Sequence, residues 1–167
     1  MLYGDGDFDQ DSLTDYYMRF YGYGVDIPEN VERLKRAAGW IAEHFDPLDT
    51  IIDFGGGDGI IEGELSRMGF ARTCTAQVGD MLPEGARLIF ASHVLEHIYA
   101  LAGVMAEIVS ALAGDGTLII DGPDATGLLQ RWGLPILDFQ TKHINHFRLI
   151  DYLHLGREWG LELVHHS

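Results

Sequence analysis

"IIDFGGGDGI", residues 51–60, is the stretch that decides the fold. Its apolar start, which ends in Asp53 and Phe54, passes directly into glycines 55, 56, 57 and 59, with Asp58 among them. An apolar run that stops at glycines is typical of a buried strand, and residues 60–68 have the pattern of a helix. A strand, a glycine turn and a helix form the geometry of nucleotide sites, because glycines let a ligand contact the backbone.

Helix and strand patterns alternate on both sides of this stretch. Helices are expected at 12–24, from Pro28 to Phe45, at 60–68, at 104–114 and at 148–160, and strands at 50–54, 72–78, 87–92, 116–121 and 161–166. This alternation predicts an α/β fold, a doubly wound, mostly parallel sheet with helices on both faces. The length of 167 residues predicts a single domain, 1–167, in which residues 1–46 form an N-terminal helical cap.

The composition excludes several classes of partner. With 26 acidic and 11 basic side chains, the formal net charge of -15 should repel nucleic acid and anionic lipid. The first residues lack the layout of a secretory signal, and the longest apolar stretch, 98–106, is too short to cross a bilayer. The single cysteine, Cys74, is expected to be a buried structural thiol. We therefore expect a soluble cytoplasmic protein that binds neither nucleic acid nor membrane.

The glycine loop does not fit the phosphate-binding patterns. No lysine follows a glycine as a Walker loop requires, and G-x-G-x-x-G fails because its last position is Ile60 or Glu62. A pyrophosphate would also be repelled by Asp58 inside the turn. A dinucleotide ligand is therefore disfavoured.

The pattern that fits is D-x-G-x-G-x-G, from Asp53 through Gly55 and Gly57 to Gly59. It resembles the first motif of the class I S-adenosylmethionine-dependent methyltransferases, and this implies a Rossmann-like methyltransferase fold. The implied cofactor, S-adenosylmethionine, carries an ammonium and a sulfonium and no phosphate, so nearby carboxylates suit it.

Four further segments resemble the same superfamily in colinear order. "ASHVLEHI", 91–98, is similar to the segment after strand four, and "IIDGPDATGLL", 119–129, to strand five and its exit. "LDFQTKHINHF", 137–147, resembles the next segment of a subgroup that includes sugar methyltransferases and enzymes of surface-polysaccharide pathways. "DYYMRFYGYG", 15–24, is similar to the aromatic cap of that subgroup, in which Tyr16 and Tyr17 could close over a substrate.

The resemblance implies a set of site residues. Those implied for cofactor binding are Asp53, Gly55, Gly57, Gly59, Asp80, Met81 and His93. His143 is the first choice for a catalytic base, with His97 and His146 as reserves. Lys142 stands where the family commonly has glutamate, which leaves His143 without its expected carboxylate partner.

Two departures from the family pattern affect the cofactor pocket. Residues 69–85 replace what should be strand two, a helix and strand three, so at least one strand and a helix are expected to be missing. Gln77 stands where an acidic residue should hold the ribose, and Asp80 could match only the adenine-side acid. The sequence also ends at the family's strand six. Unpaired sheet edges then predict a homodimer or a partner subunit that completes the sheet.

Three functions remain open. The favoured one is methyl transfer to a small polar acceptor, with a sugar or glycan intermediate as the preferred class, and the alternative is a non-catalytic methyltransferase-like binding or regulatory subunit. The third is a zinc hydrolase, because His93, Glu96 and His97 spell the H-x-x-E-H of inverted zinc peptidases. Some methyltransferases place metal ligands at this position, and His143 or His146 could add to them. The favoured interpretation contains no metal, with Glu96 and His97 capping and packing a loop.

Overall fold

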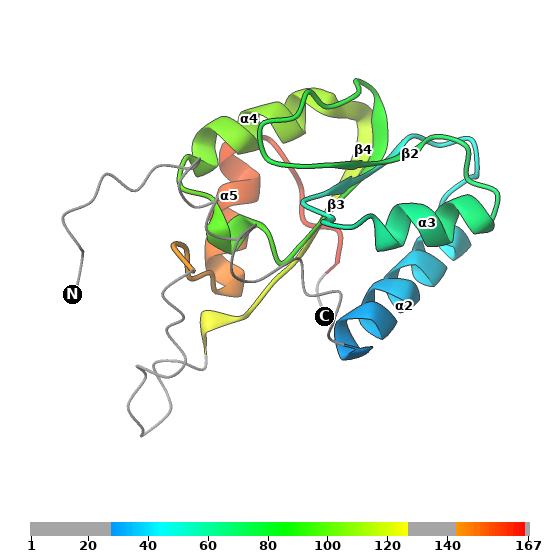
Figure 1. Cartoon of the computed structure of the whole chain (residues 1–167). Coiled ribbons are helices and arrows are strands. Elements are labelled where there is room, and N and C mark those ends of the chain that lie inside the picture. Colours follow the sequence, from blue (N-terminus) through cyan, green and yellow to red (C-terminus); the bar gives the residue numbers. More distant parts are fainter. Residues whose placement is uncertain (1–27, 127–142, 166–167) are drawn as a thin grey trace.

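A parallel sheet forms the centre of the molecule in the computed structural model, which describes residues 28–126 and 143–165. Its strands are β1 (Ile51–Phe54), β2 (Thr73–Ala76), β3 (Ala86–Ser92) and β4 (Leu112–Asp121), in the order β2-β1-β3-β4. All three strand pairs are parallel. Figure 1 shows this sheet with its helices, and the predicted α/β class is confirmed.

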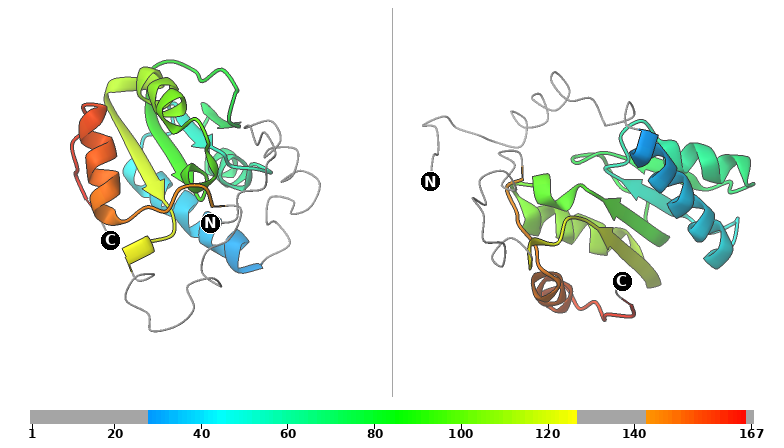
Figure 2. Two further views of the ribbon diagram at one scale, coloured as in Figure 1. Left: turned by 90° about the vertical axis from the view of Figure 1, so that its left-hand side faces the viewer. Right: turned by 90° about the horizontal axis from the view of Figure 1, so that it is seen from below.

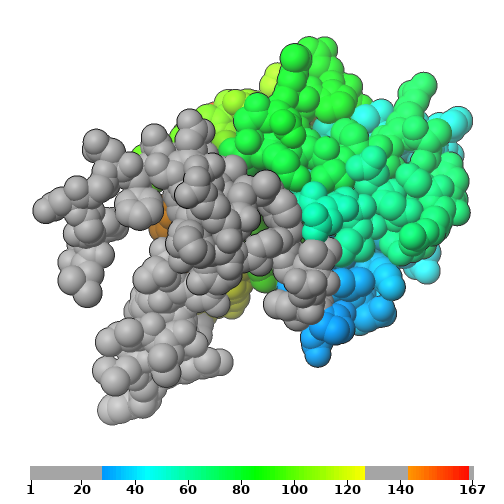
Figure 3. Space-filling view, in the orientation of Figure 1, coloured from blue at the N-terminus to red at the C-terminus, as the bar shows by residue number. Residues whose placement is uncertain are grey.

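Helices cover both faces of the sheet, as predicted. They are α2 (Pro28–His44), α3 (Ile60–Arg67), α4 (Leu101–Ala111) and α5 (Leu149–Glu158), together with the short 3-10 helix η1 (Leu95–His97). Helices α2 and α3 pack on one face, and α4 and α5 pack on the other (Figure 2). In the space-filling view, α2 lies at the lower right, below α3 (Figure 3).

The central strands β1 and β3 bury both of their faces, which explains why their sequences are mostly apolar. Ile51 and Leu88 point toward α2 and α3, whereas Ile52 and Ile89, their neighbours along the chain, point toward α4. All four side chains are fully buried. The core therefore consists of two layers, one on each side of the sheet.

The shortened region after α3 is confirmed. The chain passes from α3 into β2 and then directly into β3, and residues 77–85, all described, contain no further helix or strand. β2 is consequently an outer strand of the described sheet, next to β1.

The strand predicted at 161–166 is wrong as far as the structure describes it. Residues 161–165 form no strand and are mostly exposed, with Val164 90% exposed. The alternation of Leu161, Leu163 and their neighbours suits a strand, but a strand needs a partner. β4 is an outer strand of the described sheet, but no backbone pairing joins residues 161–165 to it.

The boundary between α4 and β4 also differs from the prediction. The helix ends at Ala111 and the strand begins at Leu112, earlier than the expected start at 116. Leu112 pairs with Ala86 while Thr117 pairs with Leu88, so the register shifts between these two pairs. An irregularity of this kind cannot be seen in a hydrophobic pattern.

Several predictions lie outside the described residues. They concern the helix at 12–24 with Tyr16 and Tyr17, most of the cap at 1–46, and Lys142. Of the helices described, none combines the length and apolarity needed to cross a membrane.

Candidate active site

The glycine loop lies at the carboxyl end of β1, where the direction of the chain through the sheet reverses. β1 stands between β2 and β3, so the chain goes to one side of β1 after α3 and to the other side after β2. In open parallel sheets, ligands bind outside the carboxyl ends of the strands at such a switch point. The motif found in the sequence therefore occupies the expected ligand position.

The spacing of the glycines is required by the backbone. Gly55, Gly57 and Gly59 have φ angles of 73°, 55° and 70°, a left-handed conformation that glycine adopts without steric cost. A Cβ on Gly55 would lie 2.5 Å from Val94 Cγ2, and one on Gly56 would lie 2.0 Å from Asp53 Oδ2. The loop is thus bare because its own neighbours, including the Asp53 carboxyl group, pack directly against the backbone.

Asp53 is a buried carboxyl group beneath this loop. Its side chain is 2% exposed, and burial, with a smaller contribution from the charge of Glu62, raises its pKa to about 7. Glu62 is itself held in place, since its Oε2 accepts a hydrogen bond of 2.8 Å from the Thr75 backbone N–H. A cation bound over the loop would favour the charged form of Asp53.

Cys74 lies in β2 opposite Ile52 and is partly buried rather than fully buried as expected. Burial, followed by the charges of Glu62 and Asp53, raises the pKa of its thiol. A raised pKa disfavours the nucleophilic thiolate, which agrees with a structural role.

The segment after β2 places Gln77 against the glycine loop. The Gln77 side-chain amide donates to the Gly57 carbonyl at 3.3 Å. Asp80 closes the turn instead, because its Oδ2 accepts a hydrogen bond of 2.7 Å from the Gln77 backbone N–H. Met81 is 95% exposed. The structure therefore brings Gln77 to the loop, while the roles of Asp80 and Met81 in cofactor binding stay predictions.

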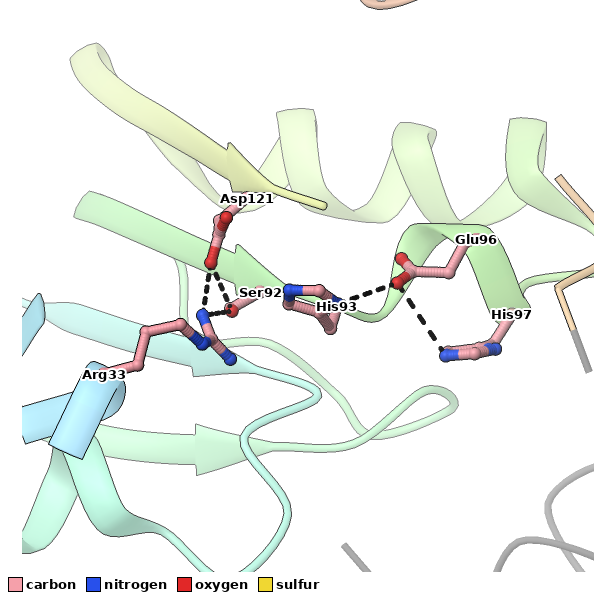
Figure 4. A network of polar contacts seen from close by, with 6 residues as sticks. All are labelled: Arg33, Ser92, His93, Glu96, His97 and Asp121. Atoms are coloured by element: carbon pink, nitrogen blue, oxygen red, sulfur yellow. Dashed lines mark hydrogen bonds and ion pairs between the residues drawn. The ribbon is translucent and has the colours of Figure 1, made fainter. Parts of the chain in front are cut away.

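A polar network joins α2 to the ends of β3 and β4 (Figure 4). Arg33 Nη1 donates to Ser92 Oγ at 2.7 Å and forms an ion pair with Asp121, and Ser92 Oγ donates to Asp121 Oδ2 at 2.9 Å. Arg33 and Asp121 are 88 positions apart in the sequence, so no local pattern signals this network.

The segment after β3 places two histidines beside a buried glutamate (Figure 4). Glu96 is 1% exposed, and its Oε1 lies 3.3 Å from His93 Nδ1 and 3.9 Å from His97 Nε2. Burial by itself would raise the pKa of Glu96, but interactions with its own backbone, His93 and His97 outweigh it, and the pKa is lowered.

The zinc-peptidase interpretation does not fit this geometry. It requires His93 and His97 on one face of an α-helix, one turn apart. His93 instead has a φ of 52° and precedes η1, which is a short 3-10 helix. The two imidazoles therefore approach Glu96 from a loop and from η1 rather than from one helical face.

Residues 143–147 are attached to this same segment by backbone and side-chain hydrogen bonds. The backbone N–H groups of Ile144 and Asn145 donate to the Glu96 carbonyl at 2.8 and 3.0 Å. The Asn145 side-chain amide donates to the carbonyls of Leu95 and Ile98, at 3.0 and 2.7 Å. This attachment positions His143.

His143 lies among the other predicted histidines. Its ring centroid is 4.8 Å from that of His97 and 6.1 Å from that of His146. Each of Glu96, His97 and His143 offers one possible ligand atom, and these three atoms lie within 4.8 Å of one another. A carboxylate therefore lies near His143, although Lys142 stands where the family commonly has glutamate. Asn145, which lies inside the predicted motif, is a positioning residue that the sequence interpretation missed.

Comparisons with known proteins bear on the family and the fold of this chain. A family model described as a methyltransferase domain matches residues 23–166. No curated protein matches the sequence. The similar solved structures include the YcgJ protein from Bacillus subtilis, with a TM-score of 0.52, 12% identity, and coverage of 74% of this chain and 67% of that one.

Two other solved structures share the fold. A candidate O-methyltransferase from Nostoc punctiforme has a TM-score of 0.55 and 14% identity, with coverage of 90% of this chain and 60% of that chain. An O-methyltransferase family 2 protein from Planctomyces limnophilus, solved in complex with apigenin, has a TM-score of 0.58 and 17% identity, with coverage of 97% and 58%. The chain therefore spans about three fifths of the length of these two proteins.

Proposed function

The chain belongs to the methyltransferase domain family, and from this premise we propose that it transfers a methyl group from S-adenosylmethionine to a small polar acceptor. The observation that carries the proposal is the glycine loop at the switch point, with Asp53 buried beneath it. The cofactor offers an ammonium and a sulfonium to such a site and needs no phosphate-binding group. A partly neutral Asp53 becomes a charged partner when a cation is bound close by.

The reaction is an in-line displacement at the methyl carbon. A bond forms between an acceptor oxygen or nitrogen and this carbon while the carbon–sulfur bond breaks, and its electron pair stays on sulfur to give S-adenosylhomocysteine. Holding the two reacting atoms in line provides most of the acceleration. An acceptor hydroxyl must also lose its proton, and a positioned base contributes typically about 10²- to 10⁴-fold.

His143 is the first choice for this base, with His97 and His146 as reserves. The support is the position of His143 and His97 beside the buried carboxylate of Glu96, with the ring of His146 6.1 Å from that of His143. A carboxylate next to an imidazole orients the ring and stabilises the imidazolium that forms when it takes a proton.

The acceptor class rests on resemblance and remains a proposal. The segment at 137–147 favours a sugar or glycan, whereas the Planctomyces protein was solved with apigenin. Because one fold serves many acceptors, the first acceptor panel should contain both sugars and apigenin.

A non-catalytic binding subunit is the second candidate. The observation that favours it is the direct passage from β2 to β3, together with Gln77 where an acidic residue should hold the ribose. A pocket shortened in this way could keep the fold and lose the cofactor.

Calorimetric titration with S-adenosylmethionine and S-adenosylhomocysteine separates the two candidates. The informative variant is Gly57→Arg, which fills the loop, and the matched control is Gly85→Arg. Gly85 also has a positive φ, 76°, and open space around it. It directly precedes β3, so it lies at the amino ends of the strands, away from the glycine loop at their carboxyl ends. We expect micromolar binding to the unaltered protein and to the control, and none to Gly57→Arg.

Either of two other results would contradict this proposal, in its function or in the position of the cofactor. A folded protein that binds neither compound would favour the non-catalytic subunit. Equal binding by both variants would show that the cofactor does not occupy the glycine loop.

A further inference from the structure

The cluster that follows β3 contains a metal-ligand set that the proposed reaction does not by itself require. Glu96, His97 and His143 each place one nitrogen or carboxylate oxygen within 4.8 Å of the others. We propose that these three side chains bind one divalent transition-metal ion of the kind that imidazole favours, such as Zn²⁺. The proposed role of the ion rests on the function proposed above, whereas its binding does not.

The burial of Glu96 is an observation independent of the clustering. The residue is 1% exposed, and its buried Oε1 has no well-formed hydrogen bond among the described residues, the nearest imidazole nitrogen being His93 Nδ1 at 3.3 Å. A buried carboxylate oxygen without a hydrogen bond is costly unless a cation compensates it. The neighbouring imidazole nitrogens lie 3.3 and 3.9 Å away, longer than a normal hydrogen bond. A metal ion bound within the cluster would compensate the charge of this oxygen directly.

The main chain around the three ligands is already fixed. Four hydrogen bonds attach residues 144 and 145 to the carbonyls of residues 95, 96 and 98, so His143 cannot move far from η1. Metal sites depend on such outer contacts, which hold the ligand side chains in orientation.

The spacing of the three ligand atoms is close to that of a metal site. Ligand atoms around a tetrahedral zinc ion lie roughly 3.4 Å apart, given metal–ligand distances of about 2.0 to 2.2 Å. The cluster, at up to 4.8 Å, is wider by little more than an ångström. Two imidazoles and one carboxylate suit zinc and its neighbours better than magnesium, which prefers oxygen ligands.

His93 has a different part in this site. Its Nδ1 faces Glu96 Oε1 and it is not among the three clustered ligands, so it orients the carboxylate from outside. The ligand set therefore differs from the H-x-x-E-H peptidase set, in which both histidines of that motif bind the metal.

Three protein ligands leave a coordination position open. An acceptor hydroxyl that occupied it would lose its proton more easily, because a bound cation lowers the pKa of an oxygen that it coordinates. In the metal-bound protein His143 would then be a ligand rather than the base, and the hydroxyl proton would pass to solvent.

The test is calorimetric titration of Zn²⁺ into protein that has been dialysed against a chelator and then freed of it. We expect one ion per chain, and loss of this binding in His143→Ala. The matched control is His154→Ala, an exposed histidine on α5 outside the cluster, which should bind zinc like the unaltered protein. His93→Ala should keep the site but weaken it by about 10- to 100-fold, as expected for an outer contact.

The outcomes are distinct for the two proposals. A folded protein that binds no zinc, or equal binding by His143→Ala, would overturn the metal site. Titration of the same samples with S-adenosylmethionine tests the proposed function separately, since that binding depends on the glycine loop. Zinc binding without cofactor binding would support the metal site and contradict the proposed methyltransferase function.

Discussion

At the scale of single residues, Asp53 connects the stability of the fold to the chemistry of the loop. Its carboxyl group packs so closely under Gly56 that no side chain fits there. The same burial raises its pKa from 3.8 to about 7. Close packing removes the carboxyl group from water, and this is the main cause of the raised pKa, to which the charge of Glu62 adds.

The raised pKa of Asp53 predicts a pH-dependent stability. Between pH 3.8 and about 7 the folded protein retains a proton that the unfolded chain has lost, so stability falls as the pH rises through this window. Asp53→Asn removes this effect. Its stability relative to the unaltered protein should rise by up to about 1.4 kcal/mol per pH unit until about pH 7 and then level off.

Urea unfolding of both proteins between pH 5.5 and 8.5 measures this difference. Since every other titrating group is shared, the difference isolates Asp53. A difference that stays constant across the range would show that Asp53 titrates normally in the folded state.

At the scale of elements, the network of Arg33, Ser92 and Asp121 is the polar link between α2 and the ends of β3 and β4. α2 otherwise packs through apolar residues such as Ala38 and Ile41, which hold the helix against the sheet without fixing its rotation as sharply. A directional contact at one end of the helix supplies that constraint. The link also lies at the carboxyl ends of the strands, the end of the sheet at which the glycine loop follows β1.

A double-mutant cycle tests the strength of this link. Arg33→Met keeps most of the side-chain stem, Asp121→Asn removes the charge, and the cycle gives their coupling. We expect roughly 1 kcal/mol, because both side chains are partly buried and share Ser92. Urea unfolding of the four proteins measures it.

The control cycle uses Lys35 and Glu32 on the same helix. Their ion pair, at 3.3 Å, is exposed and has no third partner among the contacts described, so its coupling should be no more than about 0.5 kcal/mol. Equal coupling in the two cycles would mean that the network is an ordinary surface pair.

At the scale of the whole molecule, the described sheet has two outer strands, β2 and β4. A complete methyltransferase fold would be expected to extend beyond β2, where this chain turns directly into β3. An outer strand offers unpaired backbone groups to a second chain. A second copy, joined by two-fold symmetry, is the simplest partner.

This geometry predicts self-association. Sedimentation velocity at increasing protein concentration should show a dimer, and the proportion of dimer should grow with concentration by mass action. A strict monomer at high concentration would contradict the prediction and direct the search toward a different partner subunit.

The sequence determined the local parts of this protein. Three glycines at alternate positions permit a left-handed backbone, and apolar runs such as 88–91 favour burial on both faces, so the strand, loop and helix could be predicted. The missing elements between α3 and β3 followed from comparing the few residues there with the pattern of the family that the sequence resembles. The α/β class followed because these constraints act between residues close in the sequence.

Only the tertiary structure decided the contacts between distant segments. Asn145 holds His143 beside Glu96 by hydrogen bonds that span up to 50 positions, and Arg33 reaches Asp121 across 88. Residues 161–165 have the pattern of a strand but no partner strand, so they form none. Backbone sterics act locally and can be read from a pattern, whereas the partners of a buried polar group or of an outer strand depend on how the whole chain packs.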